Sequence, residues 1–277
     1  MDTALNPIAA STTAPHPATP RRRLLSMRRV VSPLLILGAW QVASLVGVIS
    51  PRVLAAPSAI LVSAWALLVS GALLHHLAIS LARVSVGLAI GVSIGTALAL
   101  VAGLSRIGED IVDAPMQMLR TLPFLGLVPM FILWFGIGET PKIALVALGS
   151  TFPVYLNVFA GIRGVDRKLV EAGQVFGLSR AGLIRHIILP GALPAGLVGL
   201  RYSLGVAWLS LVVAEQINAD AGIGYLINDA RDFLRTDVIV VGLLVYALLG
   251  LGADALVRAL ERRALRGRPS LMAERVR

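Results

Sequence analysis

Long apolar runs alternate with short polar segments along this chain. Residues 84–104 and 143–162 carry no charged side chain, and each reaches the roughly 20 residues that a helix needs to cross a bilayer core. Four further runs of similar length carry at most two charged residues each: 30–49, 116–137, 195–214 and 238–260. The pattern predicts an all-α, polytopic membrane protein with about six transmembrane helices.

Shorter segments complete the expected organisation. Residues 59–69 are apolar but too short to cross, and Pro57 and Ser58 are typical of a helix start, so we expect an interfacial helix outside the membrane. Residues 1–29 form an expected disordered tail, because the first 20 are mostly Ala, Thr, Ser and Pro. Residues 30–260 form the transmembrane domain, and residues 261–277 form a basic tail. The alternative for the first run is a signal peptide, whose apolar region spans only about 7–15 residues before a cleavage site.

Basic residues predict the orientation. With both termini in the cytoplasm, 19 Lys and Arg side chains fall on the cytoplasmic side and five on the outer side, namely Arg52, Arg83, Lys142, Arg231 and Arg235. Short cytoplasmic loops carry such an excess.

A ridge of small residues follows the predicted helix 84–104. Gly87, Gly91, Gly95, Ala99 and Gly103 recur at every fourth position, which lets the backbone of another helix approach closely. We expect this ridge to be a packing face, although glycine is in any case frequent in membrane helices.

Composition excludes several classes of protein. The chain is 57% hydrophobic and only 14% charged, outside the range of soluble domains. Its net charge of +10 lies in tails and loops without interleaved aromatic residues, which argues against a nucleic-acid partner and favours a role in membrane orientation. The absence of cysteine excludes disulfides and thiolate metal sites.

The longest predicted cytoplasmic loop, residues 163–194, has the pattern of two short helices joined by a bend. Gly177 is the expected bend, Ser179 can cap the second helix, and Pro190 is expected to end it. From its pattern alone, this amphipathic hairpin could equally be a connector that lies on the membrane surface.

The loop also resembles the EAA loop of binding-protein-dependent importer permeases. That pattern is E-A-A, three residues, G, nine residues, I, one residue, L-P, and this chain departs from it only at Gly173. The resemblance implies the type I ABC importer permease fold, with the loop as a coupling helix that docks on an ATPase subunit. The docking residues it implies are Glu171, Ala172, Gly173, Gly177, Leu178, Ser179, Ile187, Leu189 and Pro190. Without docking, Glu171 would only cap its own helix or pair with a neighbouring basic residue.

The resemblance covers roughly residues 40–259 and is strongest to permeases for aliphatic sulfonates, carried by segments such as QMLRTLPFLGLVPMFILWFGIGE (117–139) and ARDFLRTDVIVVGLLVYALLG (230–250). Permeases for taurine, nitrate and thiamine precursors are similar over much of the same length. The family implies two ATPase copies, a second permease copy, a substrate-binding protein outside the membrane, and a location in the bacterial inner membrane.

Catalytic motifs are missing from the sequence. A phosphate-binding loop needs a Gly-Lys pair, and the two lysines, Lys142 and Lys168, follow Pro and Arg instead. We therefore expect no catalytic residue, no metal site and no cofactor in this chain, with ATP and Mg²⁺ bound by a partner. An intramembrane enzyme would need positioned acid–base groups. A purely structural membrane anchor would not need the EAA spacing.

Polar residues within the predicted spans are the candidates for a translocation path, because a polar group in the membrane usually faces a cavity or a partner. They are Arg120, Thr121, Asn157, Arg201, Trp208 and Glu215. An anionic substrate favours the two arginines, but both lie near the expected cytoplasmic end, where snorkelling explains them equally well.

Overall fold

The computed structural model describes residues 21–217 and 219–264, and every element of regular secondary structure in these ranges is a helix. The described residues up to Ile49 belong to one unit, and those from Ser50 onward belong to a second. The first unit contains α1 (Arg21–Leu45), which therefore begins within the expected N-terminal tail. Residues 1–20 of that tail, and residues 265–277 of the C-terminal one, lie outside the described ranges.

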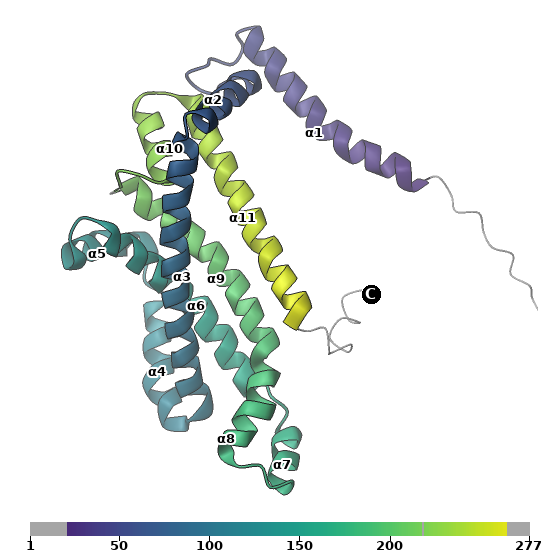
Figure 1. The fold of residues 1–277 in the computed structure, drawn as a ribbon, viewed down its shortest axis with the longest axis vertical. Helices are drawn as coiled ribbons and strands as arrows, with labels where there is room; N and C mark the ends of the chain where they lie inside the picture. Colours follow the sequence, from purple (N-terminus) through teal and green to yellow (C-terminus); the bar gives the residue numbers. More distant parts are fainter. Residues whose placement is uncertain (1–20, 218, 265–277) are drawn as a thin grey trace, which may run out of the picture. The chain divides into compact units, whose positions relative to one another are not determined.

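The second unit contains the remaining helices (Figure 1). In chain order they are α2 (Pro57–Val69), α3 (Ala72–Leu104), α4 (Arg106–Leu119), the 3₁₀ turn η1 (Phe124–Leu127), α5 (Val128–Phe135), α6 (Glu139–Arg163), α7 (Arg167–Val175), α8 (Arg180–Leu183), the π-helical turn η2 (Ile184–Ile188), α9 (Leu189–Ile217), α10 (Ile223–Asp232) and α11 (Thr236–Ala264).

Within the described residues, four stretches of helix are long and apolar enough to cross a membrane. They are α3, α6, α11 and the continuous helix Arg180–Ile217, which comprises α8, η2 and α9. Each contains one of the predicted spans and extends beyond it, because a helix continues into the polar boundary of an apolar run. α3, for example, starts at Ala72, so Arg83 lies inside a helix and not in an outer loop.

The predicted span 116–137 is wrong as a single helix. α4 ends at Leu119, a turn and η1 follow, and α5 covers only Val128–Phe135. The break has a local cause, because Pro123 has no N–H to continue the helix and disfavours helical geometry in the residue before it. The hydroxyl of Thr121 also donates to the carbonyl of Met118 at 2.7 Å.

The small-residue ridge on α3 is confirmed as a packing face. A Cβ atom at Gly87 would lie 2.6 Å from Cγ1 of Val146, and one at Gly95 would lie 2.6 Å from the carbonyl oxygen of Thr151. Helix α6 therefore approaches α3 more closely than any larger side chain on the ridge allows. Helix α9 joins this pair, since Val84, Val146, Ala207 and Leu211 form one buried cluster.

The two ends of the second unit carry different elements. Figure 1 shows α7 and α8 at one end, where α6 leads into α9, and α2 and α10 near the opposite end. α2 starts at Pro57 as predicted, and the hydroxyl of Ser63 donates to Asp237 at the start of α11. The interfacial position of α2 stays a prediction.

Candidate functional site

The α7–α8 hairpin is built by three local capping interactions. The carboxylate of Asp166 accepts from the N–H of Lys168 at 2.9 Å and starts α7, and the hydroxyl of Ser179 accepts from Gly182 at 3.2 Å and starts α8. Between them, Gly177 adopts φ +80°, its N–H donates to Gln174, and the N–H of Leu178 donates to Gly173. This pair of bonds is the Schellman arrangement, in which a left-handed glycine ends a helix, so the predicted bend is confirmed.

Pro190 does not end the second helix, contrary to our expectation. The chain continues through η2 into α9, and the N–H of Leu189 donates to the carbonyl of Ile184, five residues earlier. The wider π-helical turn lies next to a position where Pro190 has no N–H to donate, so the helix is adjusted there without being interrupted.

Gly173 is the position at which the hairpin closes on itself. It is buried, and a Cβ there would lie 2.6 Å from Cδ1 of Ile187 and 2.7 Å from Cδ2 of Leu183. Glycine at position 173, where the EAA pattern has alanine, therefore affects the contact between the two arms of the hairpin and leaves the outer surface of the hairpin unchanged.

The outer surface of the hairpin is apolar at its tip. Val175 and Phe176 are each 86% exposed, and Glu171 and Ala172 on α7 are also exposed. A soluble loop seldom presents two such side chains at a turn, and exposed apolar clusters of this kind mark interaction surfaces.

A network of charged side chains lies at the other end of the helices. The guanidinium of Arg83 on α3 donates to Oε1 of Glu215 on α9 at 2.7 Å, and to both carboxylate oxygens of Glu139 on α6 at 2.5 and 2.6 Å. Lys142 donates to Glu139 at 3.2 Å. Arg83, Lys142 and Glu215 are at most 4% exposed, so three ionisable side chains of this network are buried.

Glu215 is the most enclosed member of this network. Its carboxylate also accepts from the hydroxyl of Ser80 at 2.9 Å, the N–H of Gly224 at 2.9 Å and the hydroxyl of Tyr246 at 3.2 Å. The loop before α10 is held in turn, because Arg83 donates to the carbonyl of Ala221 at 2.6 Å. The network thus joins α3, α6, α9, α10 and α11.

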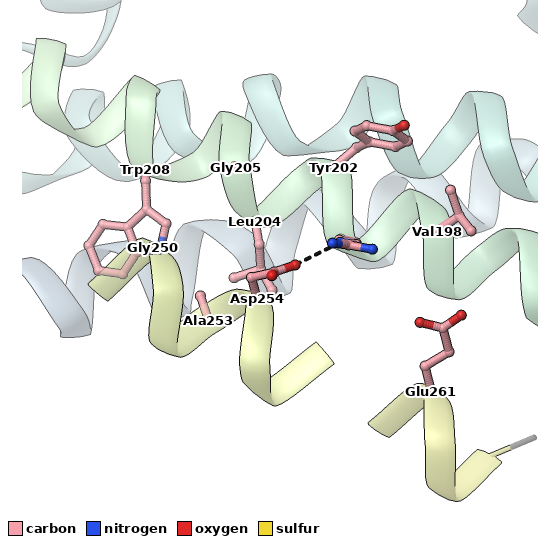
Figure 2. Close-up of a pocket in the computed structure, with 10 residues that line it drawn as sticks. Val198, Tyr202, Leu204, Gly205, Trp208, Gly250, Ala253, Asp254 and Glu261 are labelled. Atoms are coloured by element: carbon pink, nitrogen blue, oxygen red, sulfur yellow. Dashed lines mark ion pairs between the residues drawn. The ribbon is translucent and has the colours of Figure 1, made fainter. Parts of the chain in front are cut away.

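A cavity of about 480 Å³ separates α9 from α11, with Arg201 and Trp208 on one wall and Asp254 on the other. Figure 2 shows the ion pair between Arg201 and Asp254 crossing it. A second cavity, of about 650 Å³, is lined by α3, α4, α5 and α6 and contains no charged side chain.

Comparison with known proteins accounts for the hairpin and the bundle together. Residues 87–266 match the family described as the binding-protein-dependent transport system inner membrane component. The chain belongs to this family. This permease is therefore a multi-pass component of a membrane transport system, in agreement with the resemblance of its EAA loop.

Individual relatives cover nearly the whole permease. The aliphatic sulfonates transport permease protein SsuC of Escherichia coli (strain K12) is 50% identical over 91% of this chain and 97% of its own length. The taurine transport system permease protein TauC of the same organism is 37% identical over 83% of this chain and 85% of its own. Among solved structures, an amino acid ABC transporter with histidines matches with a TM-score of 0.59 over 73% of this chain and 96% of that chain, at 21% identity, which shows the shared fold.

The polar residues predicted for the translocation path lie in separate parts of the permease. Arg120 and Thr121 are exposed at the break after α4, and the amide of Asn157 on α6 donates to the carbonyl of Pro153 at 2.8 Å. Arg201 and Trp208 share the cavity between α9 and α11, whereas Glu215 is enclosed in the charged network.

Sequence reasoning missed the buried roles of Arg83 and Lys142, which it placed in outer loops. A signal for Arg83 was present, because it lies four residues before Gly87 and thus continues the ridge that packs on α6. No comparable signal marks Asp254 as the partner of Arg201, since they lie far apart in the chain, at positions 201 and 254, and only the packing of α9 beside α11 brings them together.

Proposed function

We propose that this permease forms the membrane pathway of an ATP-driven importer for small organic anions, with aliphatic sulfonates as the substrate class. One observation carries this assignment: half of the residues are identical, over nearly the full length of both chains, to a permease named for aliphatic sulfonates. Identity with the permease named for taurine is lower, at 37%. Taurine, nitrate and thiamine precursors remain the alternative substrates.

The hairpin supports a role in docking an ATPase. Its tip presents Val175 and Phe176 to solvent beside the exposed Glu171, while caps at both helices hold the bend rigid. We assign the docking surface to the residues of the EAA pattern, from Glu171 to Pro190. The inner position of Gly173 gives it a role in hairpin closure and not in direct contact.

The partners follow from the same proposal. Two ATPase copies bind ATP and Mg²⁺, a second permease copy completes the pathway, and a binding protein outside the membrane delivers the substrate. We assign no cofactor site to this chain. Among the described residues, no group of three or more His, Asp or Glu side chains could hold a metal ion. ATP-driven closure of the ATPase pair would move the two hairpins together and open the pathway outward.

Both termini are proposed to lie in the cytoplasm of a bacterial cell, with the permease in the inner membrane. The distribution of basic residues supports this orientation, since the α7–α8 hairpin carries Arg167, Lys168, Arg180 and Arg185. The buried charged network then lies toward the outer face.

Growth of a permease-deletion strain tests the substrate class. The strain should fail to grow on alkanesulfonates as the sole sulfur source, should grow on sulfate, and should recover when the permease gene is restored. Failure only on taurine, only on nitrate as nitrogen source, or only without a thiamine supplement would replace the sulfonate assignment with the corresponding substrate.

A further inference from the structure

The cavity between α9 and α11 has the size and composition of a small-ligand site. Its volume of about 480 Å³ lies within the range of about 300–1,000 Å³ that is usual for ligand pockets. The larger cavity beside α3 and α6 offers no charged group, so the α9–α11 cavity suits an organic anion better than that one. A third cavity, of about 410 Å³, contains Arg83, but Glu139 and Asp220 line it as well, so its charge disfavours an anion.

The charges in this cavity are unevenly paired. Nε of Arg201 lies 2.7 Å from Oδ1 of Asp254, and Oδ2 of the same carboxylate pairs with Arg258 one turn further along α11. One carboxylate therefore serves two guanidinium groups. If Asp254 releases Arg201, it keeps Arg258 as a partner, so the release does not leave an unpaired carboxylate in the membrane.

The rest of the cavity favours an apolar tail. Trp208 lies two helical turns beyond Arg201, and its indole N–H is buried with no hydrogen-bond partner among the described residues. Gly205 and Gly250 line the same cavity, and a Cβ atom at either would have no neighbour within 4 Å, so neither position fills the space there. Figure 2 shows the indole of Trp208 and, further along the helices, the carboxylate of Asp254 with its ion pair.

Glu261 lies at the end of the cavity opposite Trp208 and makes that end negatively charged. It lies seven residues after Asp254 on α11, which is about 10 Å along the helix axis. An anion is therefore favoured near Arg201 and disfavoured near Glu261, which gives the cavity one charged position for a head group and one apolar position for a tail.

We propose that this cavity is a binding subsite for a small amphiphilic sulfonate, whose head group displaces Asp254 from Arg201 and whose alkyl chain lies against Trp208. The proposal rests on the proposed function and adds the residues of the permease that recognise the substrate. Asp254 is the internal counterion of the empty site, and the incoming sulfonate takes its place on Arg201.

Titration of the full-length permease in lipid nanodiscs with sodium butanesulfonate tests the subsite through tryptophan fluorescence. The parent should give a saturable signal that Trp208→Phe abolishes, while n-butanol, which has the same tail without the anion, should give none. Arg201→Gln should weaken binding by about tenfold, as expected for the loss of a hydrogen bond to a charged group. Asp254→Asn should tighten binding, because it removes the competing carboxylate.

Tail length and a matched variant separate recognition from a purely structural ion pair. Between ethane- and butanesulfonate, affinity should rise by about fourfold for each methylene buried. Isothermal titration calorimetry measures the affinities here, because Trp208→Ala lacks the fluorescent reporter. Trp208→Ala should reduce that gain, whereas Leu209→Ala, an exposed neighbour on α9 outside the cavity, should not. If Asp254→Asn binds more weakly than the parent, the pair is structural and the proposal is wrong.

The outcomes also separate the two proposals. Sulfonate uptake by cells without any saturable signal from the purified permease, or with an unchanged affinity in Arg201→Gln, would overturn the subsite and leave the substrate class intact. Absence of sulfonate uptake by cells carrying the parent permease would refute the substrate class, and the subsite with it.

Discussion

Replacement of Arg83 by methionine should destabilise this permease more than most single substitutions. Arg83 contacts two carboxylates in different surroundings, because the side chain of Glu215 is 0% exposed and that of Glu139 is 55% exposed. Loss of the arginine leaves Glu215 buried without a positive partner, and breaking a buried ion pair in this way costs about 3–5 kcal/mol.

The exposed carboxylate provides the internal comparison. Glu139→Gln removes a half-exposed carboxylate from the same arginine, where solvent replaces part of the interaction, but it also takes the carboxylate partner from the buried Lys142. The expected cost is therefore about 1–2 kcal/mol, below that of Arg83→Met. Glu215→Gln combined with Arg83→Met removes both buried charges, keeps the volume, and should recover much of the stability lost in Arg83→Met.

Thermal unfolding of the purified variants in identical detergent measures these differences, with tryptophan fluorescence as the signal. Arg83→Met should lower the unfolding temperature by roughly 10 °C, and Glu139→Gln by only a few degrees. Equal effects of Arg83→Met and Glu139→Gln, or a double variant less stable than Arg83→Met, would refute the reasoning that burial of Glu215 makes its pairing essential.

Other variants test the hairpin, the ridge and the topology. Gly177→Val should abolish copurification of the ATPase at unchanged permease abundance, whereas Gly177→Asn should retain much of it, because asparagine tolerates positive φ and valine does not; equal binding by both variants would contradict a role for the bend. Gly91→Leu should lower the free energy of unfolding by several kcal/mol, and with it the abundance of the permease, because the new side chain meets the backbone of Ala147. Gly252→Leu should be tolerated, because position 252 faces open space. In this cysteine-free chain, Ala181→Cys should be protected from an impermeant thiol reagent in intact cells and Asp232→Cys should react, and the reverse pattern would invert the proposed topology.

Uniform features of the fold were predictable from the sequence, and its interruptions were not. Uncharged runs of about 20 residues identified α3 and α6, because lipid leaves few alternatives to a continuous helix. The same rule led us to predict one span over residues 116–137. This prediction was wrong because the hydropathy of the run does not reflect the N–H that is missing at Pro123. The bend of the hairpin was predictable because Gly177 and Ser179 act within their own helices.

In the candidate site too, local features were predictable from the sequence and contacts between distant helices were not. The EAA spacing is local and was read directly, whereas the cavity and the charged network depend on which helices are neighbours. Arg83 and Lys142 were placed in loops because a charge usually ends a span, yet each is buried by partners from other helices. Glu215 was predicted as a candidate for the translocation path because it is a charge within a span, and its partner on α3 could not be named without the packing of α3 against α9.

Continuity between the hairpin and the charged network has a mechanical consequence. The helix Arg180–Ile217 is 38 residues long, so it spans about 57 Å and carries the hairpin at one end and Glu215 at the other. It acts as a lever, and a rigid tilt of about 1° moves one end by about 1 Å relative to the other, which exceeds the tolerance of a hydrogen bond. The π-helical turn η2 lies close to the hairpin end, so the regular α-helical arm of this lever runs from Leu189 to the turn that carries Glu215.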